Sequence, residues 1–289
     1  METINKTSLK QRLKSYKRSP SSFILMILVV LSAVITLGVV LIVVGYILVK
    51  GIPNLKPELF AWKYTTENVS MMPAIINTIT ITFLSILFAV PIGICSAIYL
   101  VEYAKKGNKL VSIIRITAET LSGIPSIVYG LFGFLMFTIA LKFDYSLLGG
   151  ALTLSIMILP LIMRTTEEAL KSVPDIFREG SFGLGAGKLR TVFKIVLPSA
   201  VPGIFAGIIL AVGRIVGETA ALIYTAGTVA GVPENVMGSG RTLSVHMYAL
   251  LSEGLYTDQA YATAVVLLAL VVIMNMLSSL IAKKLQKGK

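Results

Sequence analysis

Long apolar segments separated by shorter polar ones dominate this sequence. Six of them approach or exceed the roughly 20 residues that a helix needs to cross the hydrocarbon of a bilayer. They cover residues 23–49, 73–101, 123–141, 147–163, 201–227 and 260–282, and the fourth is the shortest. Alternation with a period of two is absent over these lengths, which disfavours a β-barrel. The pattern therefore predicts an all-α integral membrane protein with six transmembrane helices.

The polar segments between these spans differ in their positive charge. Of the 26 Lys and Arg residues, all fall at the two termini or in the loops on one side, except Lys50, Lys56, Lys63, Lys142, Arg214 and Arg241. Because loops rich in Lys and Arg stay in the cytoplasm, both termini are expected inside. We expect residues 1–22 to form a cytoplasmic N-terminal segment and residues 23–289 to form one membrane domain.

Two loops have a local pattern of their own. Residues 105–122 alternate apolar and polar positions with a helical period, which predicts an amphipathic helix on the cytoplasmic side. Residues 122–126, Ser-Gly-Ile-Pro-Ser, should break the helix before the third span. Residues 228–259 are rich in glycine and polar side chains, and they predict an outer loop that either contacts a partner or only connects two spans.

Arg214 and Glu218 are the charged residues of the span at 201–227, which is otherwise free of charge. A charge at the centre of a membrane helix costs at least about 2.5–3.5 kcal/mol, so such residues face a protein interior or a water-filled path. Their four-residue spacing predicts that both lie on one helix face, within reach of each other. Since a guanidinium group suits phosphate, sulfate or carboxylate, we expect both residues to line a substrate pathway. A structural ion pair between two helices is the alternative.

The second span begins with a dense group of polar residues, Asn77, Thr78, Thr80 and Thr82. Polar side chains at the start of a membrane helix face other helices or water. This assigns Asn77 to the same pathway, while packing through small polar residues is the alternative for the threonines.

Composition supports a membrane protein and excludes several other classes. The mean hydropathy is +0.85, 55% of the residues are hydrophobic and 14% are charged. The net charge of +12 does not indicate nucleic-acid binding, because the positive charges are sorted by loop. Cys95 is the single cysteine, so we expect no intrachain disulfide and no cysteine metal cluster. We also expect the chain to bind no cofactor, and His246 is its single histidine. His246 is interpreted as an ordinary loop residue.

The longest loop on the basic side, residues 164–200, carries a spaced motif. It reads Glu-Gly-Ser-x3-Gly-x9-Ile-x-Leu-Pro and consists of Glu179, Gly180, Ser181, Gly185, Ile195, Leu197 and Pro198. These residue types predict a short helix, a glycine turn, and a second helix over residues 188–196 that Pro198 ends. A helical hairpin with a charged edge is suited to docking into a groove of another protein.

This motif resembles the Glu-Ala-Ala loop of ABC importer permeases, with Gly180 and Ser181 at the positions of the two alanines. Further stretches resemble the permeases of phosphate importers, and among these the PstA-type subunit more than its PstC-type sister. They are residues 122–132, residues 159–160 with 164–169, and residues 213–221, whose pattern Gly-Arg-x2-Gly-Glu-Thr also places Thr219 on the pathway.

The resemblance implies a type I (MetI-like) permease fold and a set of partners. These are a second, PstC-like permease, two PstB-like ATP-binding subunits docked on the loop 164–200, and an external PstS-like phosphate-binding protein. It also implies a location in the plasma (inner) membrane of a prokaryote, in contact with lipid.

The glycines ahead of Lys188 do not form a phosphate-binding loop, because Phe182 and Leu189 stand where the Gly-x4-Gly-Lys-[Ser/Thr] motif needs glycine and a hydroxyl residue. The chain is therefore predicted to be a transport subunit rather than an enzyme, with ATP hydrolysed by a partner. An importer of sulfate or molybdate, and an anion channel or carrier that works without ATP, are the alternatives.

Overall fold

A computed structural model describes residues 20–105 and 107–287, and this part of the chain consists only of helices and loops. The chain divides into two compact units, Met1–Lys50 and Gly51–Lys289. The described part of the first unit belongs to helix α2 (Pro20–Gly51), which contains the first predicted span. The predicted N-terminal segment 1–22 lies almost entirely outside the described residues.

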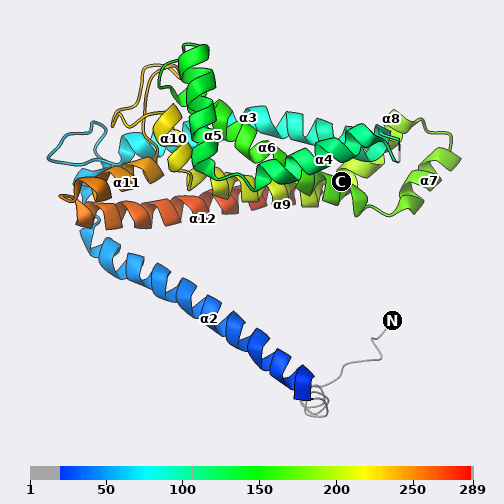
Figure 1. Cartoon of the computed structure of the whole chain (residues 1–289), viewed down its shortest axis with the longest axis horizontal. Helices are drawn as coiled ribbons and strands as arrows, with labels where there is room; N and C mark the ends of the chain where they lie inside the picture. The colour runs from blue at the N-terminus through cyan, green and yellow to red at the C-terminus, as the bar shows by residue number, and fades with distance from the viewer. Residues whose placement is uncertain (1–19, 106, 288–289) are drawn as a thin grey trace. The chain divides into compact units, whose positions relative to one another are not determined.

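The second unit contains the remaining helices (Figure 1). Its α-helices are α3 (Met72–Ile98), α4 (Lys109–Ser122), α5 (Ser126–Gly133), α6 (Leu147–Lys171), α7 (Asp175–Gly183), α8 (Lys188–Thr191), α9 (Leu197–Val216), α10 (Ala220–Thr225), α11 (Leu243–Glu253) and α12 (Thr257–Lys287). Two short 3-10 turns, η1 (Ile52–Asn54) and η2 (Pro57–Phe60), precede α3. Three π-helical segments extend or join these helices: η3 (Tyr99–Tyr103), η4 (Phe134–Ala140) and η5 (Val192–Val196).

Among the described residues, five helical stretches are long and apolar enough to cross a membrane. They are Ser21–Asn54, Met72–Tyr103, Leu147–Lys171, Lys188–Val216 and Thr257–Leu280. A sixth arises only when α4 is taken together with α5 and η4, two arms that meet at 103°. The third predicted span, 123–141, is therefore the second arm of a bent pair and not a straight helix. The predicted break is confirmed, because Pro125 lacks an N–H group and disfavours helical geometry at Ile124.

The span predicted at 201–227 is wrong at both ends. The helix starts at Lys188, runs through Pro198 and stops at Val216. Proline cannot donate a hydrogen bond to the carbonyl group four residues earlier, but here a π-helical segment, Val192–Val196, ends two residues before Pro198. The Ser199 hydroxyl group also donates to the Ile195 carbonyl at 2.7 Å. Pro198 therefore does not end the second helix of the motif, contrary to the prediction.

Helix α6 is the centre of the second unit, since 67% of the residues in its most apolar 18-residue stretch are buried. It packs against α3 and α9, and α9 packs in turn against α12 (Figure 1). Glycines allow these close approaches: a Cβ atom on Gly207 of α9 would lie 2.0 Å from Thr165 Oγ1, and one on Gly93 of α3 would lie 2.8 Å from Ile162 Cγ2. Small residues at helix crossings are the usual means of packing membrane helices.

Helix α5 approaches α10 most closely at Gly130. A Cβ atom there would lie 2.8 Å from Ala221 Cα, which is backbone and cannot rotate away. This contact fixes the position of α10, and α10 follows directly after Glu218 and Thr219.

We predict that Gly130→Ala lowers the free energy of unfolding by about 1–3 kcal/mol, the usual range for overpacking. Gly213→Ala is the matched control, because a Cβ atom on this helical glycine meets no atom within 4 Å. Thermal unfolding of the detergent-solubilised protein is the measurement. Equal melting temperatures for the two variants would contradict the packing argument.

Candidate functional site

Arg214 lies in the last turn of α9, directly before the helix breaks. Gly217 caps α9, Glu218 and Thr219 are outside any helix, and α10 starts at Ala220. The predicted arrangement of Arg214 and Glu218 on one helix face is therefore wrong, because the helix ends between them. Within the described residues, neither side chain forms an ion pair.

Glu218 is buried and stabilises the break through both its side chain and its backbone. Its Oε1 atom accepts a hydrogen bond from the Ala221 N–H at 3.2 Å, and its carbonyl oxygen accepts one from the Ser244 hydroxyl at 2.6 Å. A carboxylate at the start of a helix satisfies a free N–H group and interacts favourably with the helix dipole. Thr219 is half-buried, and its carbonyl oxygen accepts from the Ile223 N–H at 3.1 Å.

Arg214 is half-buried and has no hydrogen-bond partner in the part of the chain that the structure describes. A guanidinium group without a carboxylate partner in an apolar surrounding can bind an anion.

Asn77 lies elsewhere, at the start of α3, and is fully buried. Its Nδ2 atom donates to the carbonyl oxygens of Gly231 at 3.0 Å and Arg241 at 3.1 Å. Thr78, the next residue, accepts from the Leu243 N–H at 2.8 Å. The structure thus shows Asn77 holding the segment 231–243 against α3, and it brings Asn77 into no contact with Arg214.

The predicted outer loop, 228–259, contains helix α11 and a buried polar cluster. The Arg241 guanidinium group lies 4.8 Å from the centre of the Tyr64 ring, and the Tyr64 and His246 rings meet edge to face at 6.2 Å. Burial and the charge of Arg241 lower the pKa of His246 to about 3, so this side chain is neutral near pH 7. His246 is 1% exposed and helical, and its interpretation as a loop residue is wrong.

The motif at 179–198 forms a helical hairpin, defined here as residues 175–191, that projects from the bundle (Figure 1). Gly185 has φ +82, a conformation that favours glycine. The Ala186 N–H donates to the Ser181 carbonyl at 3.1 Å and the Gly185 N–H to the Phe182 carbonyl at 2.9 Å, which is a Schellman motif at the end of α7. Ser181 is buried, and its hydroxyl group lies 2.8 Å from that of Thr191 in the other arm.

The outer surface of the hairpin is exposed and largely apolar. Its exposed apolar residues are Ile176, Phe177, Phe182, Leu184 and Leu189, of which Leu184 is 91% exposed. Glu179 and Gly180 are also exposed, and a Cβ atom on Gly180 would meet no atom within 4 Å. Of the two small residues of the motif, Gly180 and Ser181, only Ser181 is therefore buried in the packing of the hairpin. Beyond the hairpin, Ile195, Leu197 and Pro198 are partly buried in the helix that leads into α9.

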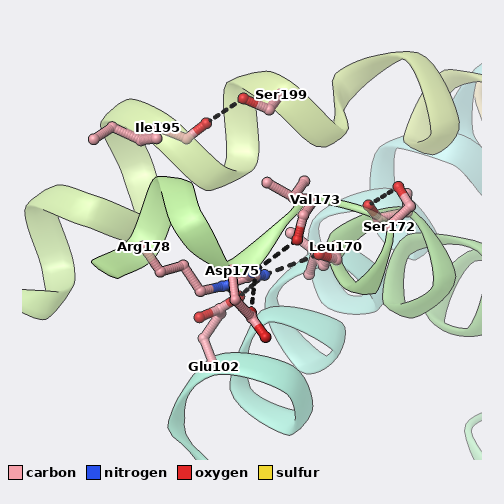
Figure 2. Close-up of polar contacts among 9 residues, drawn as sticks. Glu102, Leu170, Ser172, Val173, Asp175, Arg178, Ile195 and Ser199 are labelled. Carbon is pink, nitrogen blue, oxygen red and sulfur yellow. Dashed lines mark hydrogen bonds and ion pairs between the residues drawn. The ribbon is translucent and has the colours of Figure 1, made fainter. Parts of the chain in front are cut away.

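Arg178 attaches the hairpin to the rest of the unit (Figure 2). Its Nη2 atom lies 2.8 Å from Glu102 Oε1 in η3 and donates to the Leu170 carbonyl at 2.9 Å. Its Nη1 atom donates to the Val173 carbonyl at 2.8 Å and to Asp175 Oδ1 at 3.0 Å. One guanidinium group therefore holds η3, the end of α6 and the start of α7 together. Sequence reasoning missed this contact because Glu102 and Arg178 are far apart in the chain.

The described residues contain no group of three His, Cys, Asp or Glu side chains placed to hold a metal ion. The functional geometry consists of a broken helix with an unpaired arginine and a separate, apolar hairpin.

The sequence of this chain is similar to those of known transport proteins. Residues 89–288 match the family described as binding-protein-dependent transport system inner membrane component. A probable ABC transporter permease protein, YqgI of Bacillus subtilis, is 34% identical over 263 residues, which cover 83% of this chain and 89% of YqgI. The phosphate transport system permease protein PstA 1 of Mycobacterium tuberculosis is 34% identical over 211 residues, covering 72% of this chain and 69% of that protein.

A solved structure shares the fold. A chain of a bacterial alginate ABC transporter, in complex with its alginate pentasaccharide-bound periplasmic protein, aligns with a TM-score of 0.68. The alignment covers 94% of this chain and 98% of that chain, at 16% sequence identity. The predicted permease fold is therefore confirmed.

We predict that Arg178→Ala loosens the hairpin without unfolding the bundle. Removing one partner of a nearly buried ion pair leaves the other charge unpaired, at a cost of about 3–5 kcal/mol when burial is complete. Hydrogen exchange in residues 175–187 should accelerate by at least about tenfold, while exchange in α6 should not change. Arg190→Ala, which removes an exposed arginine of the same hairpin, should leave the exchange of both segments as it is.

Proposed function

This chain belongs to the family of binding-protein-dependent transport system inner membrane components, and we propose that it is a permease subunit of an ATP-driven importer of inorganic phosphate. The observation that carries the proposal is Arg214, an arginine without a carboxylate partner at the point where a membrane helix breaks. Relatives that are phosphate permeases make phosphate the expected substrate.

The break itself supports a substrate site. Backbone outside a helix is tolerated at membrane depth only where it is buried in protein or lines a water-filled cavity. Transporters use such discontinuous helices to bind substrates. Arg214 presents up to five N–H donors in a planar fork that matches the oxygen atoms of phosphate.

Glu218 has a different role from the one its sequence position suggests. Since it caps α10 and does not pair with Arg214, it leaves the guanidinium group available for an anion. Glu218 and Thr219 then act by keeping the ends of α9 and α10 in place, and Asn77 acts by holding the segment 231–243 on α3.

The hairpin is proposed to face the cytoplasm and to dock on an ATP-hydrolysing subunit. Most Lys and Arg residues are in the termini and in the loops that the sequence places on the same side of the membrane as the hairpin. Its exposed apolar residues, together with Glu179, suit a groove on a partner protein. Two ATPase subunits, a second homologous permease and an external phosphate-binding protein would complete the transporter.

The alternative substrates sulfate and molybdate would use the same guanidinium group. An anion channel or carrier that works without ATP would have no use for the hairpin surface. Purification in mild detergent distinguishes these classes: a co-purifying ATPase supports the importer, and ATP-independent flux through this chain alone supports a channel.

We predict that Arg214→Lys lowers phosphate uptake by about 10- to 100-fold at normal expression. Lysine keeps the charge but loses the planar fork, and a hydrogen bond to a charged group contributes about 1.5–3 kcal/mol. Uptake is measured in vesicles that contain the assembled transporter, with Arg190→Lys as the control. Uptake at the wild-type level in Arg214→Lys would leave Arg214 with a structural role only.

We predict that Gly185→Ala uncouples ATP hydrolysis from transport, whereas Gly187→Ala does not. Both glycines lie in the hairpin turn, and a Cβ atom on either meets no atom within 4 Å. Only Gly185 has a positive φ, where a side chain costs about 1–2 kcal/mol and distorts the turn. The measurement is the phosphate-stimulated ATPase activity of the assembled transporter. The same activity in both variants would remove the turn geometry from the coupling mechanism.

A further inference from the structure

The buried cluster of Arg241, Tyr64 and His246 contains a guanidinium group with unused hydrogen-bond donors. Arg241 is 5% exposed, and its Nε and Nη2 atoms are shielded from solvent. Neither atom has a hydrogen-bond partner within the described residues. A buried charged donor without a partner destabilises the folded chain, because its lost hydration is not replaced. In folded proteins such donors usually hold a bound water molecule or ion.

The two unused donors lie on one edge of the guanidinium group. The N–H bonds of Nε and Nη2 in an arginine are nearly parallel, so both can point at a single acceptor. Arg178 of the same chain uses this edge in that way, because its Nε and Nη2 atoms both donate to Glu102 Oε1, at 3.2 Å and 2.8 Å. Arg241 therefore has the geometry to bind one anionic atom.

The positive charge of Arg241 also lacks a counter-charge. No carboxylate of the described residues forms an ion pair with it. The Tyr64 ring covers one face of the guanidinium group, 4.8 Å from the ring centre, and such a contact offsets only part of the desolvation of a cation. A water molecule would accept the two hydrogen bonds but would leave the charge uncompensated. The edge therefore favours an anion over water.

The backbone of Arg241 is fixed by neighbouring segments. Its N–H group donates to the Val229 carbonyl at 2.9 Å, and its carbonyl oxygen accepts from Asn77 Nδ2 at 3.1 Å. The adjoining backbone is closely packed, since a Cβ atom on Gly240 would lie 2.7 Å from Asn77 Nδ2. The edge offers two donors, whereas a tetrahedral oxyanion has four oxygen atoms and would leave some of them buried and unpaired. A monatomic anion leaves none.

We propose that the Nε–Nη2 edge of Arg241 binds one chloride ion. Chloride supplies the single negative charge that the guanidinium group lacks, and one ion accepts both N–H groups. The bound ion neutralises Arg241 where it meets the Tyr64 ring, and so it stabilises the contact between the loop before α3 and the start of α11. This site is separate from Arg214 and does not depend on what the chain transports.

The test is hydrogen exchange of the full-length chain in mild detergent, without phosphate, as chloride replaces gluconate at constant ionic strength. Gluconate is too large for a buried site of two donors. A ligand suppresses the opening of its site by the factor 1 + [L]/Kd. Above the Kd, a tenfold rise in chloride should therefore slow exchange in residues 241–250 about tenfold. Exchange in residues 205–216, around Arg214, should not change.

Three variants locate the ion. Arg241→Met removes the charge and both donors, and its exchange should be the same at every chloride concentration. The hydrogen bonds of residue 241 to Val229 and Asn77 are made by its backbone, so this variant keeps them. Arg241→Lys keeps the charge but loses the edge, and should weaken chloride at least about tenfold. Arg214→Met is the control, since it removes the other arginine without a carboxylate partner, and it should keep the full chloride effect.

Equal exchange in chloride and gluconate would overturn the proposal in favour of a water molecule. An unchanged chloride effect in Arg241→Met, or its loss in Arg214→Met, would also overturn it, because the ion would then bind elsewhere. Equal protection by phosphate would rule out a monatomic ion. If Arg241→Met does not fold, Arg241→Lys and the salt series of the unmodified chain decide. None of these measurements involves transport, so failure of the chloride site and failure of phosphate import are separate outcomes.

Discussion

Every backbone N–H and C=O group inside an apolar bundle needs a partner, and the break between α9 and α10 must satisfy this requirement. Each unpaired group in hydrocarbon costs several kcal/mol. Here the partners are the Glu218 carboxylate for α10 and the Ser244 hydroxyl for the Glu218 carbonyl. Ser244 belongs to α11, which is fixed to α3 through Thr78. The position of Arg214 thus depends on a chain of hydrogen bonds that reaches three other helices.

The sequence was informative where the signal is local. Apolar length predicted the spans, Pro125 predicted the bend between α4 and α5, and the glycine spacing predicted the turn at Gly185. The predictions failed where a local rule was outweighed by its surroundings. A proline inside a helix normally ends or kinks it. At Pro198 the helix continues, and a π-helical segment lies just before this residue. The break after Val216 follows from Gly217 and the polar residues beyond it, which a hydropathy window averages away.

The polar contacts of the candidate site were largely hidden from the sequence. The spacing of Arg214 and Glu218 predicts a pair only if the helix is continuous, and the helix is not. Asn77 was singled out for its type, but its partners, Gly231 and Arg241, are on a segment far along the chain. The same holds for Glu102 and Arg178, and for the Arg241, Tyr64 and His246 cluster. Such contacts follow from the tertiary arrangement, and no periodicity indicates them.

Glu102 and Asn77 lie on the same helical stretch, Met72–Tyr103, and each contacts a different part of the molecule. They are 25 residues apart, which is at most about 38 Å at the α-helical rise of 1.5 Å per residue. A rod of this length acts as a lever: a tilt of about 5° moves one end by about 3 Å relative to the other, roughly the length of a hydrogen bond. A small rotation of the hairpin, transmitted from Arg178 to Glu102, would tilt this helical stretch. Such a tilt is large enough to separate Asn77, near the other end of the stretch, from the carbonyl groups to which it donates.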